Sequence, residues 1–138
     1  MIRRLALAAL VPAALALASC GVGDATASTV SVENLWAKDL AQQITKGDVI
    51  LVDVRTPEEF AEGHIEGAVN LPLGAFDPAA VPVAEGKEPV FYCRSGRRST
   101  DAAEQYAAHT KLPATHLDGG IIAWEEAGLP VVKGGADE

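Results

Sequence analysis

Two short apolar runs constrain the fold of this chain more than any other feature of its sequence. Residues 49–54 (VILVDV) and 89–93 (PVFYC) are rich in β-branched or aromatic side chains, and only one residue in them is charged. Such runs are typical of strands that are covered on both faces by helices. Segments with helical spacing lie before, between and after them, so the sequence predicts an α/β fold with a mostly parallel sheet.

The other elements follow from apolar spacing and from residues that start or stop helices. Trp36, Leu40 and Ile44 recur at intervals of four, which predicts a helix over 33–46 with one apolar stripe. Trp36 and Trp124 are therefore expected in the core. The remaining predicted elements are a first strand at 29–32, a short helix after Thr56 that ends at Gly63, a strand at 67–71, a helix at 97–109, a strand at 114–117 and a helix at 120–127.

The first nineteen residues are expected to lie outside the folded domain. Two arginines precede an apolar run at 5–18, which is too short to cross a bilayer as a helix of about 20 residues. This pattern predicts a secretory signal peptide at 1–19. Residues 17–20 (LASC) resemble the lipobox of bacterial lipoproteins, in which the cysteine is lipidated on its thiol and becomes the N-terminus. An ordinary cleaved signal with a chance cysteine is the alternative.

On this interpretation the mature chain begins at Cys20. Residues 20–28 are expected to form a flexible tether to a domain at 29–132, followed by a disordered tail at 133–138. Cleavage would remove two arginines and no acidic residue, so the formal net charge would change from −8 to −10. Such a surface repels anionic lipid headgroups and nucleic acid. Membrane attachment would therefore depend on acyl chains such as palmitate, and nucleic acid is not expected as a partner.

The lipoprotein signal also predicts where the chain resides. A lipidated chain is expected outside the cytoplasm, anchored to the cell membrane. Gly21, rather than an aspartate, follows the lipidated cysteine. By similarity to other lipoproteins, this implies the periplasmic face of the outer membrane if the host has two membranes.

The cysteine count points to a reactive thiol. Lipidation of Cys20 would leave Cys93 unpaired in an oxidising compartment. An unpaired thiol is a liability there unless the protein uses its chemistry, so Cys93 is a candidate reactive residue. His64, His109 and His116 show no paired ligand spacing with cysteine or with one another. Neither a metal site nor another cofactor is therefore expected.

Residues 93–99 (CRSGRRS) lie between a predicted strand and a predicted helix. Parallel α/β sheets bind ligands at this end of their strands, beside the start of the following helix. A short loop with a glycine can turn successive backbone N–H groups inward and form an anion site. The helix dipole can lower the pKa of a cysteine, ordinarily about 8.5, by about one unit at most. Inward amides and nearby arginines act in the same direction.

Each of these residues also has a plainer interpretation. Cys93 could be a small hydrophobic residue that ends a strand, as buried cysteines often are. The arginines could be a solvated helix start, but positive charge at a helix N-terminus opposes the dipole. Burying three guanidinium groups beside an inert thiol would be costly without anions for them to bind. The arginines therefore favour an anion site.

Three sets of residues, in this order along the chain, resemble motifs of the single-domain rhodaneses. The first set comprises Asp53-Val54-Arg55, Glu59-Phe60, residues 63–68 (GHIEGA), Asn70 and Pro72. The second is the loop from Tyr92 to Ser99, which is similar to their active-site loop. The third comprises Gly119-Gly120, Trp124, Gly128 and Pro130. The resemblance extends over about residues 30–132.

The resemblance implies a five-stranded, mostly parallel sheet with helices on both faces, and the activity of a sulfurtransferase. In that chemistry the thiolate of Cys93 takes the outer sulfur of an anionic donor, usually thiosulfate in this family, and sulfite leaves. A thiol or cyanide then accepts the sulfur from the Cys93 persulfide, which makes this covalent catalysis in two steps. A monomer is the default expectation.

The resemblance also assigns roles within the loop. The predicted substrate-binding residues are Arg94, Ser95, Gly96, Arg97, Arg98 and Ser99. Of the arginines, Arg94 and Arg97 are expected to draw in the anionic donor. Arg98, which is closest to the start of the helix, is expected to be partly structural.

Other matching residues are expected to support the site. Asp53 and Arg55, at the end of a central strand, are predicted to brace neighbouring loops rather than to react. Their predicted contacts are with Glu58 or Glu59. His64 lies in a segment rich in turns and is expected to hold the geometry of its loop.

Two other functions fit parts of this pattern. Cysteine phosphatases and arsenate reductases of the related fold need an arginine six residues after the cysteine. Here that position is Ser99, and Arg98 comes one residue early. The shorter loop suits a single sulfur better than a tetrahedral oxyanion. The second alternative is a non-catalytic rhodanese-like module that binds a partner or senses redox state, although such domains often lack the cysteine.

Overall fold

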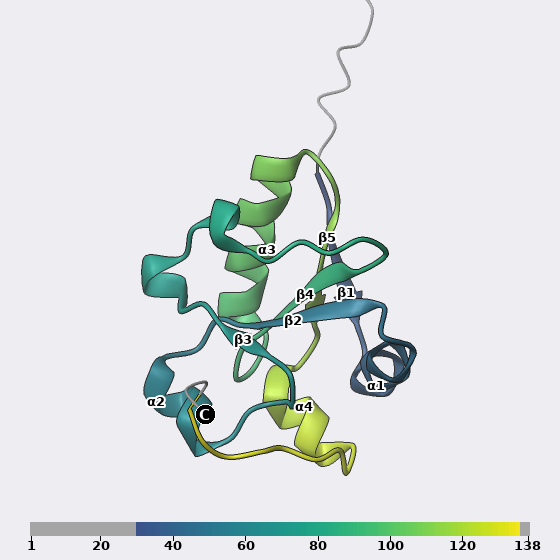
Figure 1. Ribbon diagram of the computed structural model, residues 1–138, viewed down its shortest axis with the longest axis vertical. Coiled ribbons are helices and arrows are strands. Elements are labelled where there is room, and N and C mark those ends of the chain that lie inside the picture. The colour runs from purple at the N-terminus through teal and green to yellow at the C-terminus, as the bar shows by residue number, and fades with distance from the viewer. Residues whose placement is uncertain (1–29, 136–138) are drawn as a thin grey trace, which may run out of the picture.

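The computed structural model describes residues 30–135 of the 138-residue chain (Figure 1). The predicted signal peptide, the lipidation site at Cys20, the tether and the last residues of the predicted tail lie outside this range. Within residues 30–135, no helix has both the length and the apolar character needed to cross a membrane.

Strands of the described range form a five-stranded sheet. They are β1 (Val32–Leu35), β2 (Val49–Asp53), β3 (Val69–Asn70), β4 (Glu88–Tyr92) and β5 (Ala114–Leu117). All neighbours pair in parallel, in the order β1-β5-β4-β2-β3. The two apolar runs singled out in the sequence form β2 and β4, which lie side by side within the sheet. The predicted α/β fold with a parallel sheet is confirmed.

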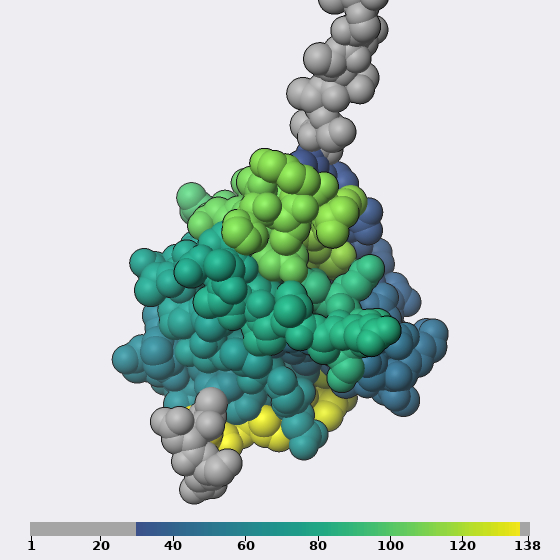
Figure 2. All heavy atoms as spheres, turned by 45° about the horizontal axis from the view of Figure 1, so that its top comes forward, coloured from purple at the N-terminus to yellow at the C-terminus, as the bar shows by residue number. Residues whose placement is uncertain are grey.

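Helices cover both faces of the sheet (Figure 1). They are α1 (Ala37–Lys46), α2 (Pro57–Glu62), α3 (Arg97–Thr110) and α4 (Gly120–Glu126), with 3-10 turns η1 (Leu73–Ala75) and η2 (Pro78–Ala80). Helices α1 and α4 pack on one face, and α3 packs on the other together with η1 and η2. The teal segment that holds these turns and the green helix α3 lie together on one face of the molecule in Figure 2.

The first strand and the first helix begin later than predicted. The first strand, expected at 29–32, is β1 at Val32–Leu35, where every residue pairs with a residue of β5. Helix α1 then begins at Ala37, and the extended backbone of its N-cap residue Trp36 leaves that side chain 63% exposed. The prediction of Trp36 as a core residue is therefore wrong. Leu40 and Ile44 of the same stripe do pack into the core.

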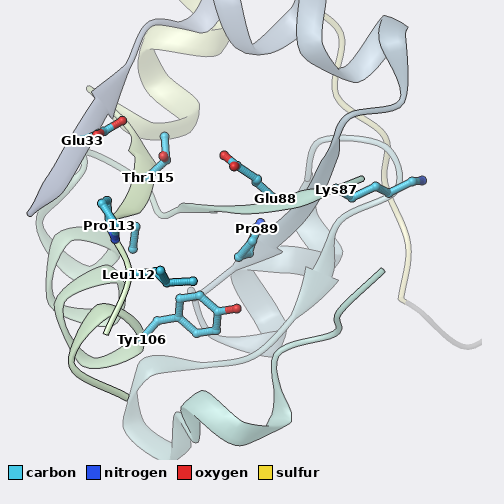
Figure 3. A pocket seen from close by; sticks show the side chains of 9 residues that line it. Glu33, Lys87, Glu88, Pro89, Tyr106, Leu112, Pro113 and Thr115 are labelled. Atoms are coloured by element: carbon cyan, nitrogen blue, oxygen red, sulfur yellow. The ribbon is translucent and has the colours of Figure 1, made fainter. Parts of the chain in front are cut away.

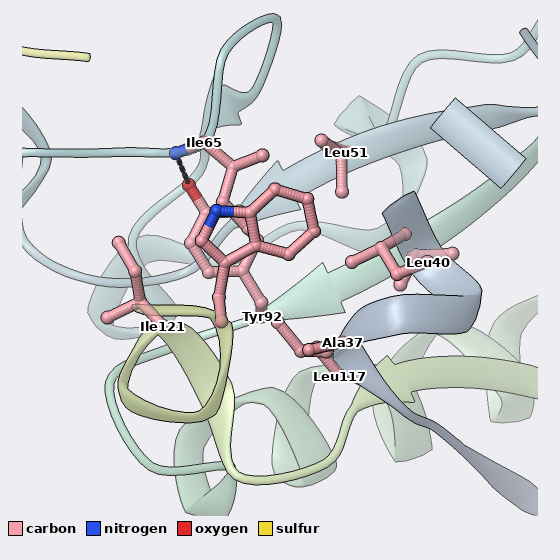
Figure 4. Packing of buried hydrophobic residues seen from close by; sticks show 9 residues of the cluster. Ala37, Leu40, Leu51, Ile65, Tyr92, Leu117 and Ile121 are labelled. Atoms are coloured by element: carbon pink, nitrogen blue, oxygen red, sulfur yellow. Dashed lines mark hydrogen bonds between the residues drawn. The ribbon is translucent and has the colours of Figure 1, made fainter. Parts of the chain in front are cut away.

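Successive residues at the end of β4 face opposite sides of the sheet, as side-chain alternation in a strand requires. Tyr92 faces α1 and α4, where it packs near Leu40 and Ile65 (Figure 4). Its hydroxyl accepts a hydrogen bond from the amide of Ile65 at 3.1 Å. Trp124 is buried in the same cluster, as predicted. Cys93 faces α3, so the sheet separates its thiol from the Tyr92 cluster.

Candidate active site

Cys93 directly follows β4, and its thiol is buried where the chain turns toward α3. Gly96 lies at the start of that helix with a φ of 106°, in the left-handed region that favours glycine. The turn brings the amide of Gly96 to 3.1 Å from the sulfur, where it donates a hydrogen bond. The thiol itself donates to the hydroxyl of Ser99, at 3.6 Å. Polar groups thus contact a sulfur that otherwise packs in an apolar cluster.

These surroundings have opposing effects on the pKa of the Cys93 thiol. Burial is the largest effect, and it raises the pKa because it disfavours the thiolate. In the thiolate, hydrogen bonds from the Ser99 hydroxyl and from the amides of Ser99, Gly96 and Ser95 stabilise the negative charge and so lower the pKa. Together they outweigh burial, so the pKa of Cys93 is below that of an ordinary cysteine. A larger fraction of the thiol is therefore ionised at neutral pH.

The start of α4 holds this loop in place. The amide of Ile121 donates to the carbonyl of Cys93 at 2.9 Å, and the amide of Ile122 donates to the carbonyl of Arg94 at 3.2 Å. A Cβ at Gly120 would lie 2.4 Å from the Arg94 carbonyl oxygen, and the φ of Gly120 is 61°. A glycine is therefore required there. Because the carbonyls of the loop bind α4, its amides are left to face the sulfur.

The arginines of the loop are not all buried around the thiol. Arg94 and Arg97 are exposed, while Arg98 forms a two-pronged ion pair with Glu59 of α2, at 2.7 and 2.8 Å. The premise that three guanidinium groups would be buried beside Cys93 is wrong, because α3 directs Arg98 toward α2. The hydrogen bonds from Arg98 lower the pKa of Glu59 to about 2. This ion pair fits the structural role expected for Arg98.

Asp53 and Arg55 form a separate buried ion pair with an N–O distance of 2.6 Å. The Arg55 guanidinium also donates to the carbonyl of Gly63 at 2.7 Å. The predicted hydrogen bonds with Glu58 or Glu59 are wrong, because Arg55 folds back onto Asp53. Glu59 acts on Arg55 through its charge alone. Burial lowers the pKa of Arg55, but the hydrogen bonds and the charge of Asp53 raise it by more. The pKa of Arg55 is therefore above its ordinary value. The pair thus ties the end of β2 to the loop after α2.

This ion pair lies on the Tyr92 side of the sheet rather than beside the thiol. The Arg55 guanidinium carbon is 5.7 Å from the centre of the Tyr92 ring. Burial, and then the charge of Asp53, raises the pKa of Tyr92 far above its ordinary value. The Tyr92 hydroxyl is therefore a permanent neutral group that anchors the Ile65 amide. The structure separates these supporting residues from the reactive one.

His116 of β5 is a buried polar residue that was not among those predicted for the site. Its Nδ1 lies 3.1 Å from the Ser99 hydroxyl, and its Nε2 lies 2.8 Å from the side-chain oxygen of Asn34. Burial lowers the pKa of His116. Alternation along residues 114–117 carries the signal that was missed, since it places His116 on the same face of the sheet as Cys93.

The loop histidine behaves as a structural residue. Nδ1 of His64 lies 2.9 Å from the carbonyl oxygen of Phe60, and the two rings stack with 3.7 Å between their centres. This arrangement agrees with the predicted role of His64 in holding loop geometry. Residues 30–135 contain no group of three or more histidine, cysteine, aspartate or glutamate side chains that could hold a metal ion.

A cavity of about 410 Å³ lies at the amino ends of the strands, at the other end of the sheet from Cys93 (Figure 3). Residues near the amino ends of β1, β4 and β5 line it, among them Glu33, Glu88 and Thr115. Cys93 lies at the carboxyl end of β4, so this cavity is separate from the thiol site.

Comparison with known proteins identifies the class to which this fold and site belong. Residues 37–127 match the family model of the rhodanese-like domain. The chain therefore belongs to the rhodanese-like family, and the fold predicted from the resemblance is confirmed.

Relatives of this chain include proteins named as sulfurtransferases. A sulfurtransferase of Allochromatium vinosum is 37% identical over 102 residues, which cover 73% of this chain and 95% of that protein. An uncharacterized protein of Synechocystis is 44% identical over 108 residues, which cover 78% of this chain but 60% of that protein. The crystal structure of a rhodanese-related protein from Thermoplasma volcanium superposes with a TM-score of 0.63 at 30% identity, covering 72% of this chain and 97% of that one.

Proposed function

We propose that this domain transfers sulfane sulfur through a persulfide on Cys93. The observation that carries the proposal is a buried thiol whose pKa is lowered by neutral hydrogen-bond donors at the carboxyl end of β4. Such a site stabilises negative charge on sulfur without placing a fixed cation against it. Membership of a family with relatives named as sulfurtransferases supports the same chemistry.

The reaction proceeds in two displacements. The Cys93 thiolate attacks the outer sulfur of a donor such as thiosulfate, a new S–S bond forms, and sulfite leaves with the electron pair of the broken bond. The persulfide carries negative charge on its terminal sulfur, close to the donors of the loop. A thiol or cyanide then attacks that sulfur, takes it, and restores the Cys93 thiolate.

Each residue of the loop has a distinct part in this proposal. Arg94 and Arg97 are exposed and attract the anionic donor by charge alone. The amides of Ser95 and Gly96, with Ser99, hold the charged sulfur. Arg98 is engaged by Glu59 and therefore supports the loop rather than binding the donor.

The same geometry argues against phosphoryl chemistry. A phosphatase loop needs a guanidinium that can grip several phosphoryl oxygens. Arg98 is the arginine nearest to the required position, and both of its terminal nitrogens bind Glu59. Ser99 occupies the required position itself, with a buried hydroxyl that contacts Cys93.

The experiment that tests the function is a sulfur-transfer assay of the protein and of its Cys93→Ala variant. Incubation with thiosulfate should add one sulfur atom to Cys93, seen by mass spectrometry and removed by a reductant. Cyanide should then be converted to thiocyanate by the wild type only. Equal rates in both proteins would reject the enzyme and leave a module that binds partners.

We propose in addition that the chain is a lipoprotein anchored through Cys20 on the extracytoplasmic side of a membrane. The basis is the lipobox-like sequence at 17–20, which lies outside the described residues. A Cys20→Ala variant expressed in bacteria should lose the lipid mass and leave the membrane fraction. Wild-type protein without lipid, recovered in the aqueous phase, would contradict this proposal.

A further inference from the structure

A chain of hydrogen bonds leads from the thiol to the far edge of the sheet. The Ser99 hydroxyl oxygen lies 3.6 Å from the Cys93 sulfur and 3.1 Å from Nδ1 of His116. Nε2 of His116 lies 2.8 Å from the Asn34 side-chain oxygen. Ser99 and His116 are buried, whereas Asn34 on β1 is exposed. The Ser99 side chain therefore joins the nucleophile to a buried imidazole, and that imidazole in turn contacts Asn34.

The register of the sheet builds this arrangement. His116 pairs with Asn34 across β5 and β1, and with Phe91 across β5 and β4. Phe91 and Cys93 share the face that α3 covers, and alternation places His116 on that face too. Ser99, in the first turn of α3, packs between the thiol and the imidazole. The contacts thus come from elements of the core rather than from mobile surface groups.

The partners of His116 determine its tautomer. The Asn34 oxygen accepts a hydrogen bond, so Nε2 of His116 carries the hydrogen. In the neutral ring Nδ1 then has a lone pair 3.1 Å from the Ser99 oxygen. The Ser99 hydroxyl donates to the Gly96 carbonyl at 3.0 Å, so its hydrogen must turn from that carbonyl to Nδ1 for a proton to pass. Burial lowers the pKa of His116, while the charge of Asp118 raises it to a lesser extent. Burial therefore favours the neutral ring, in which the Nδ1 lone pair is the available proton acceptor.

We propose that His116 is a positioning residue that holds the proton of the Cys93 thiol, which it receives through Ser99. The S–H bond breaks as the thiol proton passes to the Ser99 oxygen, and the hydroxyl O–H bond breaks as its proton passes to Nδ1. No electrons are exchanged. The products are a thiolate and an imidazolium, with the hydroxyl between them donating to the sulfur. This inference rests on the proposed function, in which Cys93 attacks as a thiolate.

The location of the thiol makes such a route useful. Cys93 is 1% exposed, so its proton has little direct contact with solvent. Arg98 interacts with the thiol through its charge, but Glu59 already neutralises that charge in part. An imidazolium behind Ser99 would supply the positive charge that the buried thiolate otherwise lacks.

A spectroscopic experiment on the wild type tests the proton transfer without using the sulfur-transfer assay. The full chain, labelled with ¹⁵N in its histidines, is examined at neutral pH while ultraviolet absorbance, corrected with a Cys93→Ala blank, measures the Cys93 thiolate. The protonated fraction of His116 Nδ1 should match the thiolate fraction, and both should vanish when iodoacetamide alkylates Cys93. A thiolate beside an unprotonated Nδ1, or no thiolate at all, would overturn the inference.

Substitutions supply the second readout. His116→Asn leaves an oxygen near the position of Nδ1 but cannot take up a proton. The thiol pKa should rise by about one unit, and alkylation at neutral pH should slow about tenfold. Ser99→Ala should behave similarly, whereas His109→Asn, an exposed matched control on α3, should match the wild type. A His116→Asn protein with wild-type thiol pKa and reactivity would overturn the inference.

The two proposals fail in different ways. If thiolate and imidazolium form together but thiosulfate transfers no sulfur, the proposed function is wrong and the proton route stands. If sulfur is transferred and His116→Asn keeps the thiol pKa and alkylation rate of the wild type, the function stands and the role of His116 is wrong.

Discussion

Two buried polar clusters lie near the carboxyl ends of the strands, on opposite faces of the sheet. The Asp53–Arg55 pair ends β2 on the side of α1 and α4, and it contains one full charge of each sign. The Cys93–Ser99–His116 cluster lies on the side of α3 and contains no permanently charged group. Both satisfy their hydrogen bonds, but only the second contains a group that can change its charge near neutral pH.

The difference separates support from reactivity. In the Asp53–Arg55 cluster the two charges offset each other, so its contribution is to hold the chain together. In the thiol cluster, donors surround one sulfur atom that is neutral or negative according to its proton. A site that must gain and lose negative charge during sulfur transfer is better served by neutral donors than by a fixed ion pair.

The largest expected effect is on activity and comes from Cys93→Ala. Without the sulfur no persulfide can form, so thiocyanate production should fall to background, whereas the midpoint of urea unfolding should change little. Thiocyanate formation and unfolding are measured on the same preparations. Residual activity well above background would show that another group carries the sulfur.

The next largest effect is on stability and comes from Asp53→Ala. Removal of the carboxylate leaves Arg55 buried and unpaired, which should lower the free energy of unfolding by about 3–5 kcal/mol. The exposed Asp77→Ala loses only a hydrogen bond to the amide of Ala79 and is a suitable control. Urea unfolding measures both variants. A loss below about 1 kcal/mol for Asp53→Ala would mean that the pair is not the brace described above.

Gly120→Ala tests whether α4 sets the shape of the catalytic loop. Its Cβ would meet the Arg94 carbonyl oxygen, so the loop must shift, at a cost of about 1–3 kcal/mol, and sulfur transfer should slow. Gly128→Ala is the matched control, because its φ of 75° is also positive but its Cβ would meet nothing within 4 Å. Equal unfolding free energies and equal activities in the two variants would contradict this role.

The sequence predicted the frame of the fold better than the details of the site. The apolar runs at β2 and β4 and the cysteine loop between β4 and α3 were found because burial and turn residues leave local patterns. The predicted hydrogen bonds of Arg55 with Glu58 or Glu59 and the burial of three arginines beside the thiol were wrong, since both depend on how the side chains are directed in space. His116 was missed because its partners are distant in sequence and become neighbours only through strand order.

The smallest effect concerns the Arg98–Glu59 pair, which is partly exposed and should contribute about 0.2–1 kcal/mol. The pKa of Glu59 falls from 4.5 to about 2 on folding, so the folded state binds its proton less tightly than the unfolded state does. This contribution is therefore fully present above pH 4.5 and is lost as the pH falls toward 2. The free energies of unfolding of the wild type and of Glu59→Gln, measured across this pH range, should become equal at its acid end. A difference in unfolding free energy that does not change with pH would exclude this link between the Glu59 pKa and stability.

The most direct test of the central claim is a titration of Cys93 itself. Ultraviolet thiolate absorbance and the rate of alkylation by iodoacetamide are followed against pH, with Cys93→Ala as the blank. The thiol pKa should lie clearly below the ordinary value of about 8.5, because amide and hydroxyl donors outweigh burial. A pKa at or above that value would contradict the claim that this loop stabilises an anionic sulfur.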